Sequence, residues 1–290
     1  MKKLLVLSGK GGTGKTTVAS ALIHLFGVNR FADCDVDAPN LHLSVAFPPG
    51  KAEEDNYGLP KAEIDQGACD RCGLCVSLCR FRAIASDKSG HFLIDPAACE
   101  GCALCAVACE ARAISMRPAV TGSLIAYSGG DRFFSTARLR MGSGNSGKLV
   151  SAVKKRLKDA GDMGGIAVID GSPGIGCPVI ASVSGVDLIL IVAEPTLSGI
   201  SDMERILKTA CQLGANCTVC VNKADVNAEI ADEIELACAK AGIPFLGRIP
   251  FDRNVVEAVN TGETIVDHGG VAAQAIEALS EKVKSLLEVS

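Results

Sequence analysis

The segment GKGGTGKT, residues 9–16, fits the spacing G-x-x-x-x-G-K-[ST] and lies between an apolar run and a helical pattern. The apolar run is Lys3–Leu7, and Thr16–Phe26 have helical spacing, so the order is strand, loop, helix. Glycines let backbone N–H groups turn toward a phosphate, and the start of a helix adds the positive end of its dipole. In this context the motif predicts a phosphate-binding loop rather than a chance glycine-rich turn.

The rest of the chain alternates continuously apolar runs with helical patterns. Such strands are buried on both faces, so we expect an α/β fold with a parallel sheet covered by helices on both sides. The expected strands are Ile166–Asp170, Leu188–Ala193, Cys217–Asn222 and Phe245–Ile249, and the expected helices are Lys148–Ala160, Gly199–Leu213, Ala228–Ala241 and Val271–Leu287.

The alternation stops near residue 62 and resumes near Gly122, and the interruption holds eight of the 14 cysteines. It contains a repeat with an offset of 30 residues, seen in Ile64 and Ile94 and again in Ile84 and Ile114. So regular a repeat indicates a structural duplication. We therefore predict a P-loop domain at 1–62 and 118–290 and an inserted small α+β domain, similar to bacterial ferredoxins, at 63–117.

Each repeat carries C-x-x-C-x-x-C-x-x-x-C, the bacterial ferredoxin pattern, in which the fourth cysteine ligates the other cluster. A zinc site, the alternative, needs four thiolates around one ion and does not account for eight sulfurs in duplicate. The usual proline after the fourth cysteine is replaced by Arg80 and Glu110. The expected ligands are Cys69, Cys72, Cys75 and Cys109 for one [4Fe–4S] cluster, and Cys99, Cys102, Cys105 and Cys79 for the second.

The phosphate loop supplies the first expected site residues. Lys15 is expected to place its charge on the β- and γ-phosphates, and Thr16 to offer its hydroxyl to Mg²⁺. The other expected nucleotide-binding residues of the loop are Gly11, Gly12, Thr13, Gly14 and Thr17.

A second lysine, Lys10, precedes Lys15 by five residues, and on its own it could be a solvated surface charge. The segment KGGTGKTT nevertheless resembles the deviant Walker A motif of MinD/ParA/Mrp-type P-loop ATPases. In that family the early lysine reaches the phosphates of the other subunit in a dimer. The resemblance therefore implies a nucleotide-dependent homodimer in which Lys10 acts in trans.

Two further segments are similar to motifs of the same family. ADCDVDAPNLHL, residues 32–43, resembles its acidic segment, which implies that Asp35 orients the attacking water and that Asp33 supports it. A strand-end carboxylate that only caps backbone is the alternative for Asp35. IAVIDGSPGIGCP, residues 166–178, resembles a Walker B strand with switch II, which implies that Asp170 holds Mg²⁺ and that Gly174 turns its N–H toward the γ-phosphate.

The C-terminal half carries two segments that resemble the family's adenine contacts. In CVNKAD, residues 220–225, the resemblance places Asn222 at the adenine edge and Lys223 beside the ring. In GRIPFD, residues 247–252, it places the backbone from Pro250 to Asp252 over the base. The expected cofactors are thus ATP, Mg²⁺ and two [4Fe–4S] clusters.

The six cysteines outside the repeats lie mostly in apolar segments, where buried, inert thiols are the usual case. Cys177 is the exception to watch because it follows switch II. These cysteines are Cys34, Cys177, Cys211, Cys217, Cys220 and Cys238.

Composition limits the partners. A net charge of −4, with no Trp and two Tyr, gives neither a basic patch nor stacking surfaces for nucleic acid. No apolar stretch approaches a membrane span, and the C-terminal helical pattern has only a narrow stripe at Ile276, Leu279, Val283 and Leu286. We therefore expect a cytoplasmic protein without stable membrane association.

Three functions fit these observations. The leading one is an ATPase, slow without its partner, that couples nucleotide state to electron transfer through the two clusters. The first alternative is an ATPase that carries iron–sulfur clusters to an apo-protein, although full cysteine ligation argues against easy release. The second is a MinD/ParA-like regulatory switch that senses redox state. The redox or apo-protein partner is unidentified in each.

Overall fold

The computed structural model describes residues 1–162 and 164–289. The chain divides into two compact units. The first contains Met1–Glu54, Leu124–Arg138 and Ser146–Ser290, and the second contains Asp55–Ser123 and Leu139–Asn145. The second unit includes the whole segment 63–117 that the repeat singled out, together with flanking residues.

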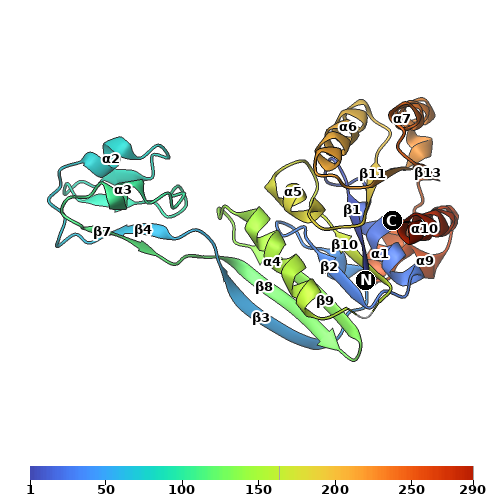
Figure 1. The fold of residues 1–290 in the computed structure, drawn as a ribbon, viewed down its shortest axis with the longest axis horizontal. Helices are drawn as coiled ribbons and strands as arrows, with labels where there is room; N and C mark the ends of the chain where they lie inside the picture. The colour runs from blue at the N-terminus through green and yellow to red at the C-terminus, as the bar shows by residue number, and fades with distance from the viewer. Residues whose placement is uncertain (163, 290) are drawn as a thin grey trace. The chain divides into compact units, whose positions relative to one another are not determined.

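A nine-stranded sheet runs in the order β13-β12-β11-β1-β10-β2-β9-β8-β3, and from β13 to β9 every neighbouring pair is parallel (Figure 1). The α/β fold with a parallel sheet is therefore confirmed. The strands are β1 (Lys2–Leu7), β2 (Arg30–Asp33), β3 (Gly50–Tyr57), β8 (Val120–Gly129), β9 (Arg132–Leu139), β10 (Ile166–Asp170), β11 (Leu188–Ala193), β12 (Cys217–Asn222) and β13 (Phe245–Ile249).

Helices pack on both faces of this sheet. Successive side chains of a central strand point to opposite faces, and both sets are apolar and buried. In β1, Leu4 and Val6 join a core with α1 (Lys15–Leu25) and α10 (Val271–Val289), beside α9 (Ile265–His268). Leu5 and Leu7 alternate with them and are fully buried as well. The helices α4 (Ser146–Asp159), α5 (Cys177–Val183) and α6 (Leu197–Gln212) contact β2, β1 and β11 respectively. Beyond them, α7 (Ala228–Ala241) packs on β12 and β13, and α8 (Asn254–Thr261) packs on α9.

The C-terminal helix α10 belongs to this core. Ile276, Leu279 and Val283, three of the four predicted stripe residues, are at most 2% exposed. The fourth buried position is Leu287, whereas Leu286 is only partly buried. Within residues 1–162 and 164–289, no helix combines the length and the apolar character needed to cross a membrane.

The strands β3, β8 and β9 have no counterpart among the predicted strands. β9 is held beside β2 by the stacked rings of Phe31 and Phe134, whose centroids lie 4.9 Å apart. β3 has the sequence GKAEEDNY and is almost entirely exposed, so no apolar run marks it. Charged residues of this kind are typical of the outermost strand of a sheet, where they discourage pairing with another chain.

Besides the ends of β3 and β8, the second unit contains two short helices and two antiparallel strand pairs. β4 (Lys61–Ile64) pairs with β7 (Ile114–Arg117), and β5 (Ile84–Ser86) pairs with β6 (Phe92–Ile94). The helices are α2 (Leu74–Leu78) and α3 (Leu104–Val107). Each strand pair therefore joins one strand of the first repeat to one strand of the second, so the two repeats are interleaved rather than placed side by side.

Candidate functional site

The phosphate loop leaves β1 at Leu7 and enters α1 at Lys15. Gly12 and Gly14 have φ angles of +81° and +88°, a left-handed backbone that favours glycine. A Cβ on Gly14 would also lie 2.1 Å from the Asn222 side chain, whose Nδ2 donates to the Thr13 carbonyl at 2.7 Å. The loop is thus bound to the end of β12 and requires glycine at this contact.

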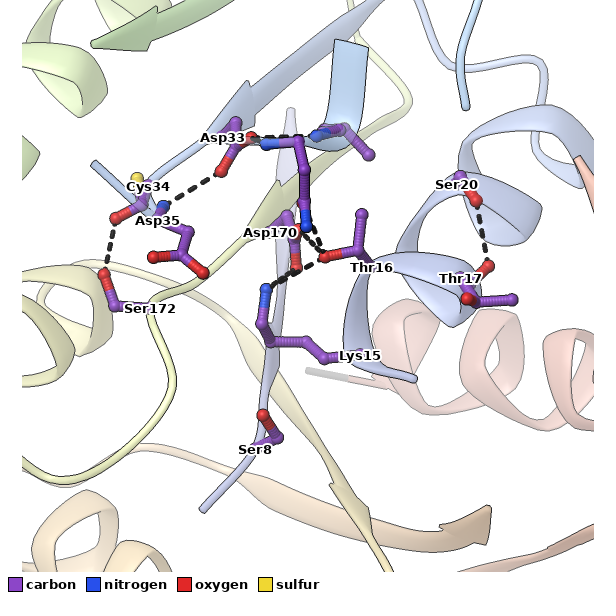
Figure 2. A network of polar contacts seen from close by, with 12 residues as sticks. Ser8, Lys15, Thr16, Thr17, Ser20, Asp33, Cys34, Asp35, Asp170 and Ser172 are labelled. Atoms are coloured by element: carbon purple, nitrogen blue, oxygen red, sulfur yellow. Dashed lines mark hydrogen bonds and ion pairs between the residues drawn. The ribbon is translucent and has the colours of Figure 1, made fainter. Parts of the chain in front are cut away.

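Behind the loop lies a buried network of charged and polar side chains (Figure 2). Lys15 Nζ donates to Asp170 Oδ1 at 2.5 Å, and Thr16 Oγ1 donates to Asp170 Oδ2 at 2.7 Å. Thr16 Oγ1 also lies 3.1 Å from Asn40 Oδ1. Burial lowers the pKa of Lys15, but the facing Asp170 outweighs it, so the net pKa is raised and the ammonium stays charged. A hydroxyl, a carboxylate and an amide oxygen converge here, and such oxygens suit Mg²⁺.

Asp33 shapes the segment that follows β2. Its fully buried carboxylate accepts backbone N–H groups from Asp35 at 2.9 Å, and from Asn40 and Leu41 at 3.0 Å each. Burial and the neighbouring Asp170 raise its pKa, while Lys15 and the backbone donors oppose the rise. The contacts agree with the supporting role expected for Asp33: it fixes the turn that carries Asp35.

Asp35 lies at the wall of a cavity of about 700 Å³ beside the phosphate loop. Burial raises its pKa to about 6, with Lys15 opposing the rise. A carboxyl with this pKa ionises just below neutral pH, which suits a group that must accept a proton from water.

The cavity has a polar end at the loop and an apolar end beyond it, and its size is typical of a small-molecule site. The apolar end includes Ile249, Phe251 and Val255. Of the predicted site residues, Asp170, Gly174 and Pro250 do not line the cavity. The predicted residues that do are Lys10, Gly11, Gly12, Thr13, Gly14, Lys15, Thr16, Thr17, Asp35, Asn222, Lys223 and Asp252.

Several groups that were predicted to contact the nucleotide form hydrogen bonds within the protein instead. The N–H of Gly174 donates to the Ser8 carbonyl at 2.9 Å. Lys223 Nζ donates to the Gly12 carbonyl at 3.0 Å. Asp252 accepts the N–H groups of Asn254 at 3.0 Å and Ala272 at 3.2 Å. Their roles toward phosphate and adenine stay predictions.

Lys10 lines the cavity, and its ammonium group contacts the turn after β11. Its Nζ is 2.9 Å from Glu194 Oε2 and 3.4 Å from the hydroxyls of both Thr196 and Ser198. The other oxygen of Glu194 lies 3.0 Å from Lys223 Nζ. One carboxylate therefore serves two lysines of the nucleotide site.

In the second unit, the two repeats contribute cysteines to a common hollow. Cys79, the fourth cysteine of the first repeat, lines it together with the first three of the second repeat, Cys99, Cys102 and Cys105. In the other set, Cys75 and Cys109 both pack on the small core of this unit, and burial, together with nearby Cys69 and Cys72, raises the pKa of Cys75.

The backbone around the cysteines repeats with the sequence. Arg82 and Arg112, and likewise Gly73 and Ala103, have positive φ angles of similar size. The Sγ atoms of Cys79 and Cys109 accept the N–H groups of Ala83 and Ala113 at 3.4 and 3.3 Å. Hydrogen bonds to sulfur of this kind are among the contacts that tune thiolate-bound clusters.

Among the described residues, no three His, Cys, Asp or Glu side chains converge as they would on a single metal ion. The assignment of the eight repeat cysteines as cluster ligands stays a prediction from their spacing.

The remaining cysteines divide by exposure. Cys34, Cys217, Cys220 and Cys238 are buried, and burial raises the pKa of Cys34 and Cys220 to about 12, so both thiols are inert. Cys177 and Cys211 are exposed.

Two residues of the nucleotide site were missed by the sequence analysis. Asn40 is the asparagine of the acidic segment at residues 32–43, so that motif could have identified it. Glu194 follows β11 directly, and no pattern in the sequence distinguishes it from an ordinary strand-end carboxylate.

Comparison with known proteins is consistent with the P-loop fold and the nucleotide-binding loop described above. Residues 4–265 match the family described as the CobQ/CobB/MinD/ParA nucleotide binding domain. The uncharacterized protein MJ0578 of Methanocaldococcus jannaschii is 34% identical over 98% of this chain and 97% of its own length.

Two solved structures share the fold. The septum site-determining protein MinD of Pyrococcus horikoshii, complexed with Mg-ADP, has a TM-score of 0.57 at 18% identity and covers 99% of this chain and 98% of its own. The cell division ATPase MinD of Pyrococcus furiosus has a TM-score of 0.56 at 18% identity, with 98% and 99% covered. The chain belongs to the CobQ/CobB/MinD/ParA family of nucleotide-binding domains.

Proposed function

We propose that this protein is an ATP-driven switch. Mg-ATP binds in the 700 Å³ cavity and brings two copies together, and hydrolysis separates them. The observation that carries the proposal is the opening of Lys10, Lys15, Thr16 and Asp35 onto one cavity. The adenine would lie toward Ile249 and Phe251, with Asn222, Lys223 and the Pro250–Asp252 backbone around it.

The residues of the site divide the chemistry among them. Lys15, freed from Asp170, balances the charge that develops on the phosphates, together with the backbone N–H groups of residues 11–16. Thr16 and Asp170 would hold Mg²⁺, which supplies charge neutralisation at the phosphate oxygens when bound. Asp35 orients the attacking water and takes its proton. Lys10 of the other copy adds positive charge from the open side.

The test is the oligomeric state of the full chain in the presence of Mg²⁺ and AMPPNP, a non-hydrolysable ATP analogue, measured by analytical ultracentrifugation. The wild type should form dimers that Mg-ADP does not support. Lys10→Ala should bind the analogue but remain monomeric. A wild type that stays monomeric at all concentrations would overturn the proposal.

A second function is favoured by the duplicated cysteines. We propose that the insertion at 63–117 of the P-loop domain (1–62 and 118–290) holds two [4Fe–4S] clusters. Their ligands would be Cys69, Cys72, Cys75 and Cys109 for one cluster, and Cys99, Cys102, Cys105 and Cys79 for the other. The specific support is the hollow that Cys79 shares with three cysteines of the other repeat. The clusters would supply one-electron transfer, with their redox state linked to the nucleotide switch.

This second function is tested on anaerobically purified protein. About eight irons and eight sulfides per chain are expected for two cubanes. Redox titration followed by EPR, with and without Mg-ATP, should show a shift in at least one cluster potential if the two parts are coupled. Potentials indifferent to nucleotide would exclude coupling, and transfer of iron and sulfide to an apo-ferredoxin would favour the carrier function instead.

A further inference from the structure

The contacts of Lys10 point to a residue that controls when this lysine becomes available. Glu194 lies just after β11 and before the start of α6, and its side chain is only 19% exposed. Its carboxylate oxygens lie 2.9 Å from Lys10 Nζ and 3.0 Å from Lys223 Nζ. Burial raises the pKa of Glu194, but its hydrogen bonds to the two lysines outweigh this, so the net pKa is lowered and the group is charged.

The backbone holds Glu194 in this position. The N–H of Thr196 donates to the Glu194 carbonyl at 2.8 Å, and the Thr196 hydroxyl accepts the N–H of Gly199 at 3.0 Å to cap α6. A Cβ on Gly199 would lie 2.1 Å from the Glu194 carbonyl, so this close approach requires glycine. The carboxylate is therefore presented from a fixed turn rather than from a free loop.

The same turn surrounds the ammonium group of Lys10 with oxygen atoms. Besides Glu194, the hydroxyls of Thr196 and Ser198 lie 3.4 Å from Lys10 Nζ. Three oxygen acceptors therefore bind the Lys10 ammonium group within its own copy, whereas in the dimer the same group would have to reach phosphates bound to the other copy. Lys10 cannot make both sets of contacts at once.

We propose that Glu194 is a positioning residue that retains Lys10 on its own subunit and so raises the ATP-bound protein concentration needed for dimerisation. The inference rests on the proposed function, because it assumes that Lys10 acts in trans. Through its second oxygen, Glu194 also holds Lys223, which in turn donates to the Gly12 carbonyl at 3.0 Å. Release of Lys10 is thereby connected to the conformation of the phosphate loop.

The experiment compares wild type, Glu194→Gln, Lys10→Ala and the double variant by sedimentation with Mg²⁺ and AMPPNP. Partly exposed ion pairs contribute little, so Glu194→Gln should tighten the dimer by about two- to five-fold. In the Lys10→Ala background the same change should have no effect, because no lysine remains to be released. Glu281→Gln is the matched control, since it removes an exposed pair with Lys284 at 3.2 Å on α10.

The outcomes separate the two proposals. If the wild type dimerises and Lys10→Ala does not, but Glu194→Gln leaves the dimer constant unchanged or weakens it, the role of Glu194 is overturned. An equal effect with and without Lys10 also overturns it. A wild type that never dimerises overturns the switch itself, and this inference with it.

Thermal unfolding of each variant checks that the fold is intact. Should Glu194→Gln fail to fold, Glu194→Asp provides the same test, because it keeps the charge but its shorter side chain loses the 2.9 Å contact with Lys10. It should tighten the dimer in the same direction.

Discussion

The two units of this protein hold their reactive groups in opposite ways. In the first unit, Lys15, Asp33 and Asp170 are at most 5% exposed. Lys15 and Asp170 form an ion pair, and Asp33 accepts three backbone N–H groups. In the second unit, the buried apolar residues are few, and Cys72 and Cys102 are exposed; the buried ones are Ala62, Ala83, Ile84, Cys99, Ala113 and Ile114. One site is assembled by packing, and the other is a set of donors around a very small core.

This difference has an energetic consequence. Small domains rarely gain enough stability from their core alone and commonly depend on disulfides or metals. All cysteines here are free thiols, so the second unit has no disulfide to stabilise it. Bound metal contributes its binding energy to folding when the unfolded chain lacks a site. We therefore expect the first unit to be stable without ligands and the second to depend on its clusters.

The largest effect in the first unit is expected from a variant that impairs ATP hydrolysis but leaves the fold intact. Asp35→Asn should lower ATP hydrolysis by about 100-fold or more, because proton transfer and orientation by a positioned carboxylate contribute roughly that much. The phosphate loop, Lys15 and Thr16 are unchanged in this variant, so ATP affinity should be retained. Phosphate release measures the rate and fluorescent ATP measures the affinity; a loss below ten-fold would contradict the role of Asp35.

A cysteine variant tests the second unit with a smaller but more local effect. Cys75→Ala should reduce iron from about eight to about four per chain, since one of two cubanes loses a ligand. Hydrogen exchange within residues 55–123 should rise, whereas ATP affinity should not change. Cys220→Ala is the matched control, because this thiol is fully buried in β12. Equal iron in both variants would exclude Cys75 as a ligand.

Much of this contrast could be predicted from the sequence, for a physical reason that differs between the units. Apolar runs such as Leu188–Ala193 are buried on both faces, so their composition alone predicts a central strand. The ferredoxin pattern led us to expect Cys79 beside Cys99, Cys102 and Cys105, and these four line one hollow. Their role as ligands stays a prediction.

The rest could not be predicted because tertiary contacts decide it. β3 is charged and exposed, and only its pairing beside β8 makes it a strand. The contact of Lys10 with Glu194 of its own chain depends on the turn after β11, because Glu194 lies 184 positions further along the chain. Neither an apolar pattern nor a local motif records such a contact.

The smallest expected effect is the pH dependence of stability that Asp35 contributes to the first unit. Its pKa is raised from 3.8 to about 6, so the folded chain binds this proton more tightly than the unfolded chain does. The resulting stabilisation is complete below pH 3.8 and is lost as the pH rises through 6.

Asp35→Asn cannot ionise and avoids that loss. After allowance for solvent screening of a partly exposed group, its melting temperature at pH 7.5 should exceed that of the wild type by on the order of 2 °C. Near pH 4.5 the two curves should approach each other, because Asp35 is then mostly protonated. Calorimetry across this range measures the difference, and a gap that widens on acidification would mean that the Asp35 carboxylate is stabilised, not penalised, by its site.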